Sequence, residues 1–86
     1  MNKAEILQKV IELAAEHGTV NVQEVSPATH FVNDLQYDSL TRVEFVMALE
    51  DEFELSIPDE DAQKAQTVQD VVDYLEDRVK SQPAGA

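Results

Sequence analysis

The sequence predicts an all-α protein, a small bundle of three main helices and one short helix with a long first loop. Two observations support this fold class. Apolar residues recur at helical spacing in three separate segments, each of which follows a residue that can cap a helix. The one candidate strand has no second strand to pair with. The length of 86 residues favours one domain over residues 1–80 and a disordered tail over residues 81–86.

The first helix is expected over about residues 3–16. Asn2 can cap it, and Glu5 three residues later can complete a capping box. Six apolar residues recur at helical spacing along this segment: Ile6, Leu7, Val10, Ile11, Leu13 and Ala14. Gly18 follows them, and we expect it to end the helix in the left-handed conformation.

The connection over about residues 18–37 is long for an ordinary loop in a compact domain. We expect six apolar side chains to hold this irregular segment against the helices: Val20, Val22, Val25, Phe31, Val32 and Leu35. A strand over residues 19–25 is the alternative, because Val20 and Val22 alternate there with polar neighbours.

The second helix is expected over residues 39–53, with Asp38 as its N-cap. A short loop then leads to a brief helix over about residues 59–64. Pro58 stands near the start of this piece, where proline suits the first helical turn.

The last helix is expected to begin after Thr67, which can cap it together with Asp70 three positions later. Five apolar residues give this helix a single core-facing stripe: Val68, Val71, Val72, Leu75 and Val79. A helix of this kind needs one apolar neighbour and leaves its other side to water.

The helix over residues 39–53 differs because it has two apolar stripes on nearly opposite sides. One stripe contains the aromatic residues and predicts core: Phe45, Val46, Leu49 and Phe53. The other is Leu40, Val43 and Met47, and it is flanked by three acids, Glu44, Asp51 and Glu50. We interpret this second stripe as an exposed docking strip for a partner with a basic rim. The alternative is that the bundle buries this helix on two sides.

The charge balance favours basic protein partners over nucleic acid. Eighteen acidic residues against six basic ones give a formal net charge of −12, and phosphate binding needs clustered Lys and Arg. The alternative is that the negative charge serves only to keep the chain soluble. The chain has no cysteine, no apolar run of membrane-spanning length and no signal-peptide core near Met1. We therefore expect a soluble cytoplasmic protein, and we also expect a monomer.

Ser39 occupies the first position of the second helix. Unpaired backbone N–H groups and the positive end of the helix dipole favour an anion at this position. A phosphate ester on the hydroxyl would therefore be stabilised there. From position alone, however, a serine at a helix start is usually only a helix-start residue.

Four segments in this order resemble the acyl carrier protein family. Residues 34–40, Asp-Leu-Gln-Tyr-Asp-Ser-Leu, are similar to the family's Asp-Ser-Leu attachment site. Residues 43–53 resemble its second helix, residues 57–62 its third-helix entry and residues 67–75 its fourth helix. The resemblance covers roughly residues 3–79 and implies the acyl-carrier-like bundle of a discrete, type II carrier.

The resemblance implies a covalent cofactor, phosphopantetheine, which a phosphopantetheinyl transferase moves from coenzyme A to Ser39, beside Asp38. The arm then carries acyl thioesters to ketosynthase, reductase, dehydratase and acyltransferase enzymes with basic surfaces. Five residues map onto the partner-facing helix: Leu40, Val43, Glu44, Met47 and Glu50. Six residues would line a pocket for the acyl chain: Phe31, Val46, Phe53, Ile57, Tyr74 and Leu75.

Three positions depart from the family pattern. Gln36 stands where the family usually has Gly, Tyr37 replaces a small or aliphatic residue, and Thr41 stands where Asp is usual. These departures leave the pathway open. Fatty-acid synthesis is one pathway, and a specialised carrier for polyketide, aminoacyl, peptidyl or lipopolysaccharide synthesis is the alternative.

An enzyme is not expected, because His17 and His30 lie in no recognisable nucleophile motif. The acids over residues 50–61 lack the alternating spacing and central Gly of a calcium loop, so no metal site is expected. An unmodified acidic helical interaction domain is the alternative from another functional class.

Overall fold

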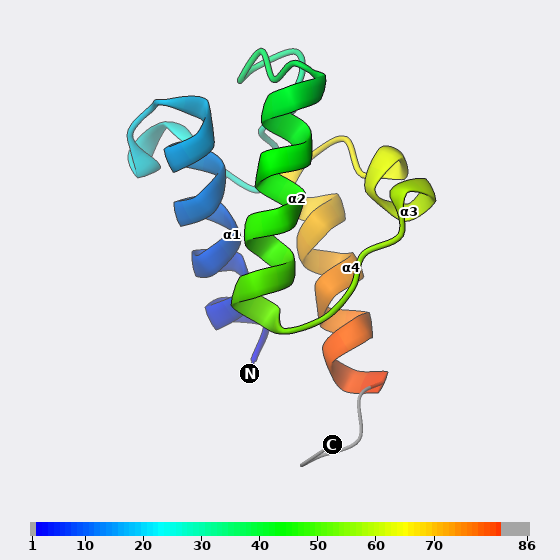
Figure 1. The fold of residues 1–86 in the computed structure, drawn as a ribbon. Coiled ribbons are helices and arrows are strands. Elements are labelled where there is room, and N and C mark those ends of the chain that lie inside the picture. Colours follow the sequence, from blue (N-terminus) through cyan, green and yellow to red (C-terminus); the bar gives the residue numbers. More distant parts are fainter. Residues whose placement is uncertain (1, 82–86) are drawn as a thin grey trace.

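The computed structural model describes residues 2–81 and is all-α, as the sequence predicts. Its elements, in order, are α1 (Lys3–Gly18), the 3₁₀ turn η1 (Val22–Glu24), α2 (Ser39–Phe53), α3 (Asp59–Lys64) and α4 (Val68–Ser81) (Figure 1). The predicted bounds of α2 and α3 are confirmed. The alternative of a strand over residues 19–25 is wrong, because this segment contains only the single turn η1.

Helix α1 starts as predicted but ends at Gly18, two residues beyond the expected range. The Glu5 amide donates to Asn2 Oδ1 at 2.9 Å, and the Asn2 amide meets the Glu5 carboxylate in return. The left-handed residue is Thr19 (φ 57°, ψ 44°), so the prediction for Gly18 is wrong. Gly18 lies within the helix, where an added Cβ would stand 3.3 Å from Tyr37 Cε1. Its missing side chain therefore provides space for Tyr37 rather than backbone freedom.

The long connection is fixed to the start of α4 by backbone hydrogen bonds. The Val68 amide donates to the Thr29 carbonyl at 3.0 Å, and the Phe31 amide donates to the Gln66 carbonyl at 3.0 Å. An isolated antiparallel bridge between His30 and Thr67 lies between them. These bonds satisfy backbone groups that a buried loop would otherwise leave unpaired.

Four of the six apolar side chains expected to hold the long connection do so. Val25 and Phe31 are buried, while Val20 and Leu35 are partly buried against the core. The prediction is wrong for Val22 and Val32, whose side chains are exposed. The backbone hydrogen bonds to the start of α4 also hold this connection in place. Apolar spacing in the sequence does not reveal such bonds.

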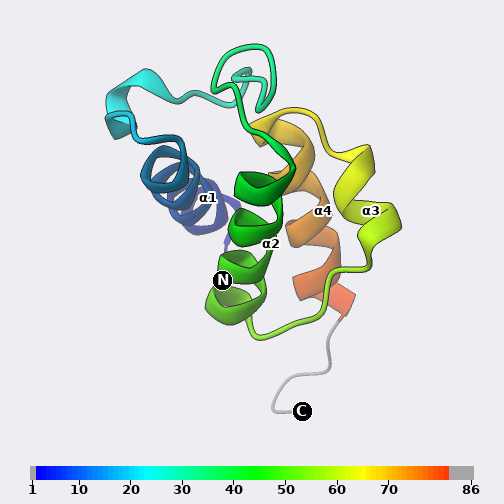
Figure 2. The same cartoon turned by 45° about the horizontal axis from the view of Figure 1, so that its top comes forward.

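The core lies between α1, α2 and α4, while α3 lies outside it, beside α4 and on the far side from α1 (Figures 1 and 2). The largest fully buried side chains come from these three helices: Ile6, Val10, Leu49, Val68, Val72 and Leu75. No residue of α3 is buried. The short helix therefore covers one side of the bundle without contributing a buried side chain to its core.

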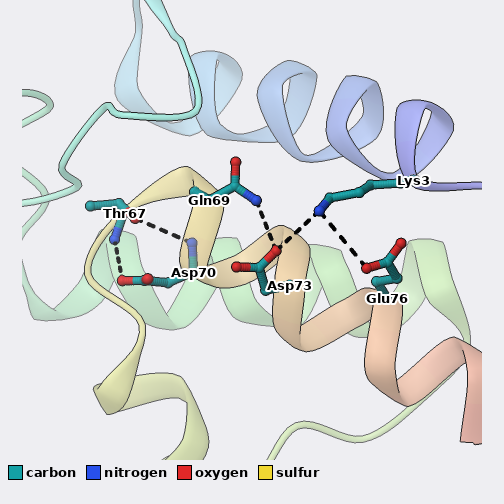
Figure 3. A network of polar contacts seen from close by, with 6 residues as sticks. All are labelled: Lys3, Thr67, Gln69, Asp70, Asp73 and Glu76. Carbon is teal, nitrogen blue, oxygen red and sulfur yellow. Dashed lines mark hydrogen bonds and ion pairs between the residues drawn. The ribbon is translucent and has the colours of Figure 1, made fainter.

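Polar contacts fix the start of α4 and join it to α1 (Figure 3). Thr67 and Asp70 form the predicted capping box, with the Asp70 amide 3.2 Å from Thr67 Oγ1 and the Thr67 amide 3.1 Å from Asp70 Oδ2. Lys3 Nζ lies 3.5 Å from Asp73 Oδ1 and 4.0 Å from Glu76 Oε1. All three side chains of this ion-pair cluster retain solvent exposure, so its contribution to stability is small.

Helix α4 continues to Ser81, the first residue of the tail expected over residues 81–86. The rest of that expected tail, residues 82–86, lies outside the described residues. Within residues 2–81, no helix has the length and apolar character needed to cross a membrane.

Candidate functional site

Ser39 is the first residue of α2, and Asp38 caps the helix just before it. The Thr41 amide donates to Asp38 Oδ1 at 2.8 Å, and this bond lowers the pKa of the Asp38 carboxyl. The carboxylate is therefore engaged with the backbone rather than with its neighbour. The side chain of Ser39 is exposed, and its hydroxyl forms no hydrogen bond with any other described residue.

The two histidines have structural partners of their own. His30 Nδ1 accepts hydrogen bonds from the amides of Val32 and Asn33 at 3.2 and 3.0 Å, so this imidazole caps a turn of the long loop. The ring of His17 packs edge-on against Phe45, with 6.2 Å between the ring centres. Neither imidazole is hydrogen-bonded to Ser39, so neither forms a nucleophile–base pair with it.

Tyr37 fixes the approach to the site from inside the bundle. Its side chain is buried, and its hydroxyl donates to the backbone carbonyl of Ala14 in α1 at 2.7 Å. Its ring centre lies 5.4 Å from that of Phe31 and 5.8 Å from that of Phe45. Burial raises the pKa of Tyr37. The sequence analysis noted Tyr37 only as a departure from the family pattern. Its structural role could have been suspected because a large aromatic residue stands in a polar stretch of the loop.

Gln36 has a left-handed backbone, with φ at 57°. Gly adopts positive φ without strain, so this conformation fits the Gly that the resemblance leads one to expect at this position. The chain retains the same turn with a glutamine, at a cost on the order of 1–2 kcal/mol. The turn directs the chain from the loop into Tyr37 and Asp38, and so sets where Ser39 lies.

Helix α2 presents its two stripes as expected. Phe45, Leu49 and Phe53 are buried, and Val46 is partly buried. Leu40, Val43 and Met47 are 66%, 55% and 60% exposed. The alternative that the bundle buries this helix on two sides is therefore wrong. Three large apolar side chains therefore face water along α2, beginning with the residue next to Ser39.

The acids beside this strip have different surroundings. Glu44 is exposed, as a rim residue would be. Glu50 is partly buried, and its Oε2 accepts a hydrogen bond from the Ile57 amide at 2.7 Å. Glu50 therefore holds the segment that enters α3 as well as contributing negative charge to the edge of α2.

A groove of about 430 Å³ lies between α2 and α3, and Ser39, Val43 and Met47 line it. Beneath it is a cavity of only about 30 Å³ between α2, α3 and α4. Four of the six residues predicted for an acyl-chain pocket line this cavity: Phe31, Val46, Ile57 and Tyr74. Phe53 and Leu75 do not; both are buried in the core.

Arg42 also lines both spaces, and sequence reasoning missed it. One guanidinium nitrogen, Nη2, donates to the carbonyl oxygens of Ala62, Gln63 and Ala65 at 2.8, 3.4 and 2.5 Å. These carbonyls belong to the C-terminal end of α3. The available signal was that Arg42 is the single base between Ser39 and Gln63.

A second polar contact holds the middle of α3. The Tyr74 hydroxyl donates to Asp61 Oδ2 at 2.8 Å and accepts from Arg78 Nη1 at 2.5 Å. Burial raises the pKa of Tyr74, and its hydrogen bond to Asp61 raises it further. Among the described residues, no three His, Cys, Asp or Glu side chains lie close enough together to hold a metal ion.

Comparison with known proteins agrees with this architecture. Residues 6–75 match the family described as "Phosphopantetheine attachment site". The chain is 48% identical over 79 residues to an acyl carrier protein of Thermosynechococcus vestitus, an alignment that covers 92% of this chain and 98% of the relative. The chain therefore belongs to the acyl carrier protein family, as a carrier of acyl groups on a covalently bound phosphopantetheine.

Proposed function

We propose that Ser39 is the residue that bears the phosphopantetheine arm. The observation that carries this assignment is the place of Ser39: its exposed hydroxyl stands at the first position of α2 and forms no hydrogen bond to another residue of the range 2–81. The backbone N–H groups and the dipole of the helix N-terminus favour the negative charge of a phosphodiester there. The arm, when bound, supplies a terminal thiol that holds acyl groups as thioesters.

The transferase that modifies Ser39 must itself activate the hydroxyl. Asp38 is the nearest carboxylate in sequence, but its Oδ1 accepts the Thr41 amide in the N-cap. Neither His17 nor His30 is bonded to the serine. A phosphopantetheinyl transferase therefore has to bring its own base, and the carrier contributes an accessible, well-positioned nucleophile.

We propose the exposed strip Leu40, Val43 and Met47 as the docking face for the transferase and for the enzymes that use the acyl group. Contact with three apolar side chains would bury area on binding, while Glu44 and Glu50 add negative charge at the edge. Ketosynthases, reductases, dehydratases and acyltransferases with basic surfaces fit such a face. The strip begins next to Ser39, so docking would bring the arm close to the partner.

The cavity behind α3 is the proposed entry for the acyl chain. Its lining by Phe31, Val46, Ile57 and Tyr74 is largely apolar, which suits an alkyl chain. A volume of about 30 Å³ holds on the order of one or two water molecules. The cavity must therefore enlarge before a chain of several carbons can enter.

Fatty-acid or related synthesis is the pathway we propose, with the specialised pathways as alternatives. We place the protein in the cytoplasm as a monomer. The absence of cysteine fits a reducing compartment. A formal net charge of −12 makes copies of the chain repel one another.

The test is the intact mass after incubation with coenzyme A and a broad-specificity phosphopantetheinyl transferase. The wild-type protein should gain one phosphopantetheine and Ser39→Ala should gain none. A transferase that modifies a control carrier but leaves this chain unchanged would refute the assignment and favour an unmodified interaction domain. The acyl group captured on the protein in its native host would then distinguish fatty-acid synthesis from the specialised pathways.

A further inference from the structure

Helix α3 depends on contacts from its neighbours. It has six residues, none of them buried, and a helix this short is not stable alone in water. Its position is set by contacts along its length. The Glu50–Ile57 bond holds the segment before it, the Tyr74–Asp61 bond holds its middle, and Arg42 holds its C-terminal end.

The Arg42 contact is unusual among these three because it caps one helix from another. The last carbonyls of a helix lack intrahelical partners and carry the negative end of its dipole. A guanidinium on α2 supplies the missing donor to Ala62, Gln63 and Ala65. Among the ion pairs of the described residues, none involves Arg42. Its charge is therefore directed at the end of α3 rather than at a carboxylate.

Arg42 also lies at the boundary between the two spaces on this side of the bundle. Four residues line both the outer groove and the inner cavity: Arg42, Val46, Ile57 and Ala62. Ala62 belongs to α3, and its carbonyl is one of the Arg42 acceptors. Widening the cavity toward the groove separates α2 from α3 at this point and stretches that contact.

We propose that Arg42 is a positioning residue that latches α3 over the cavity and so limits how far an acyl chain on the arm enters the protein. This inference rests on the proposed attachment of the arm at Ser39. Chain entry breaks the latch, so the latched state favours chains that stay in the groove. Loss of the latch lowers the stability of the unloaded protein and at the same time favours burial of a long chain.

Two substitutions test the latch, with one matched control. Arg42→Met removes all donors but keeps much of the aliphatic stem. Arg42→Lys keeps the charge, and an ammonium has three N–H donors on one atom, whereas Nη2 reaches its three carbonyl acceptors with two. Lys9→Met is the control, since it also removes one cation. Lys9 lies on α1 and pairs with Glu52 of α2 at 3.6 Å.

The first measurement is amide hydrogen exchange in the unmodified protein. Amides of α3 should exchange about tenfold faster in Arg42→Met, because a hydrogen bond from a charged group contributes roughly this factor. Arg42→Lys should exchange more slowly than Arg42→Met, and Lys9→Met should match the wild type. Unchanged exchange in α3 of Arg42→Met would show that Arg42 does not hold the helix.

The second measurement uses proteins that the phosphopantetheinyl transferase has loaded from acyl coenzyme A with a short or a long acyl chain. Mass spectrometry confirms that loading is complete. Attachment of the long chain should raise the melting temperature of Arg42→Met by more than it raises that of the wild type, each compared with its own unacylated form. The thioester of Arg42→Met should also react several-fold more slowly with hydroxylamine. Arg42→Lys should lie near the wild type. The short chain should show little difference between variants.

The outcomes separate this inference from the function on which it rests. If Ser39 accepts no arm, the proposed function fails and this inference fails with it. If loading is normal but Arg42→Met lowers the melting temperature of acylated and unacylated forms equally, with thioester reactivity unchanged, Arg42 has only a structural role. That result would overturn the inference while leaving Ser39 as the attachment site.

Discussion

The hydroxyl of Tyr37 donates a hydrogen bond to the backbone carbonyl of Ala14 at 2.7 Å. This bond joins the residue before the N-cap of α2 to the C-terminal half of α1. Because Gly18 has no side chain, the Tyr37 ring can lie close to the end of the same helix. The position of Ser39 is therefore determined from within the core as well as by the cap of its own helix.

Tyr37→Phe keeps the ring and removes this bond. We expect the free energy of unfolding to fall by about 1 kcal/mol at neutral pH. Burial raises the pKa of Tyr37 in the folded state, so the folded protein holds the phenol proton more tightly than the unfolded chain does. The contribution is complete below about pH 10, the usual tyrosine pKa, and is lost as the pH rises further.

Urea denaturation of both proteins at neutral and alkaline pH measures this effect. The advantage of the wild type over Tyr37→Phe should shrink above about pH 10. All other titrating groups are common to the two proteins, so their effects cancel in the difference. A difference in stability that stays constant up to strongly alkaline pH would mean that Tyr37 does not titrate with unfolding.

Gln36→Gly should stabilise the protein, in contrast to most glycine substitutions. The backbone at Gln36 has φ at 57°, and relief of this strain should exceed the entropy that glycine adds to the unfolded chain. We expect a gain of about 0.5–1 kcal/mol. Gln66→Gly is the matched control, since Gln66 is an exposed loop glutamine without positive φ. That control should lose stability, and an equal loss at both positions would contradict the strain argument.

Local sequence patterns were sufficient to predict the helices but not the contacts between them. The cap Asp38 and apolar spacing predicted α2, and Pro58 predicted the start of α3, because these signals are local. Gly18 was misassigned because its role depends on Tyr37, far along the chain. Phe53 was expected to line the pocket, yet it is buried away from the cavity. Periodicity identifies a buried face but does not say which buried residues surround an empty space.

The acidic segment around α2 and α3 should make stability depend on ionic strength. Between Val43 and Gln63 there are eight acids and no base. Glu52 pairs with Lys9 at 3.6 Å, which offsets only part of this charge. Added salt or millimolar divalent cations should raise the melting temperature by screening or bridging the repulsion. A melting temperature that is the same in low and high salt would show that repulsion is not significant.

The two faces of α2 should respond differently to substitution. Phe53→Ala truncates a buried aromatic side chain and should cost roughly 3–5 kcal/mol of stability. Met47→Ala should leave stability nearly unchanged, because the Met47 side chain is 60% exposed. It should instead weaken the complex with the transferase, with little dependence on salt, since it removes apolar contact. If Met47→Ala melts as low as Phe53→Ala, the strip belongs to the core and the docking proposal fails.

Glu44→Lys tests the electrostatic part of the docking proposal. Glu44 is exposed beside the strip, so reversing its charge should not unfold the protein. It should slow modification by a transferase with a basic rim, mainly through slower association, because charges at the rim of an interface act by steering. The defect should shrink as salt rises, since the Debye length falls from about 10 Å at 0.1 M to about 3 Å at 1 M. Modification kinetics at several salt concentrations measure this, beside thermal melting of the same variant. Wild-type rates in low salt would show that the negative charge of Glu44 does not guide that transferase to Ser39.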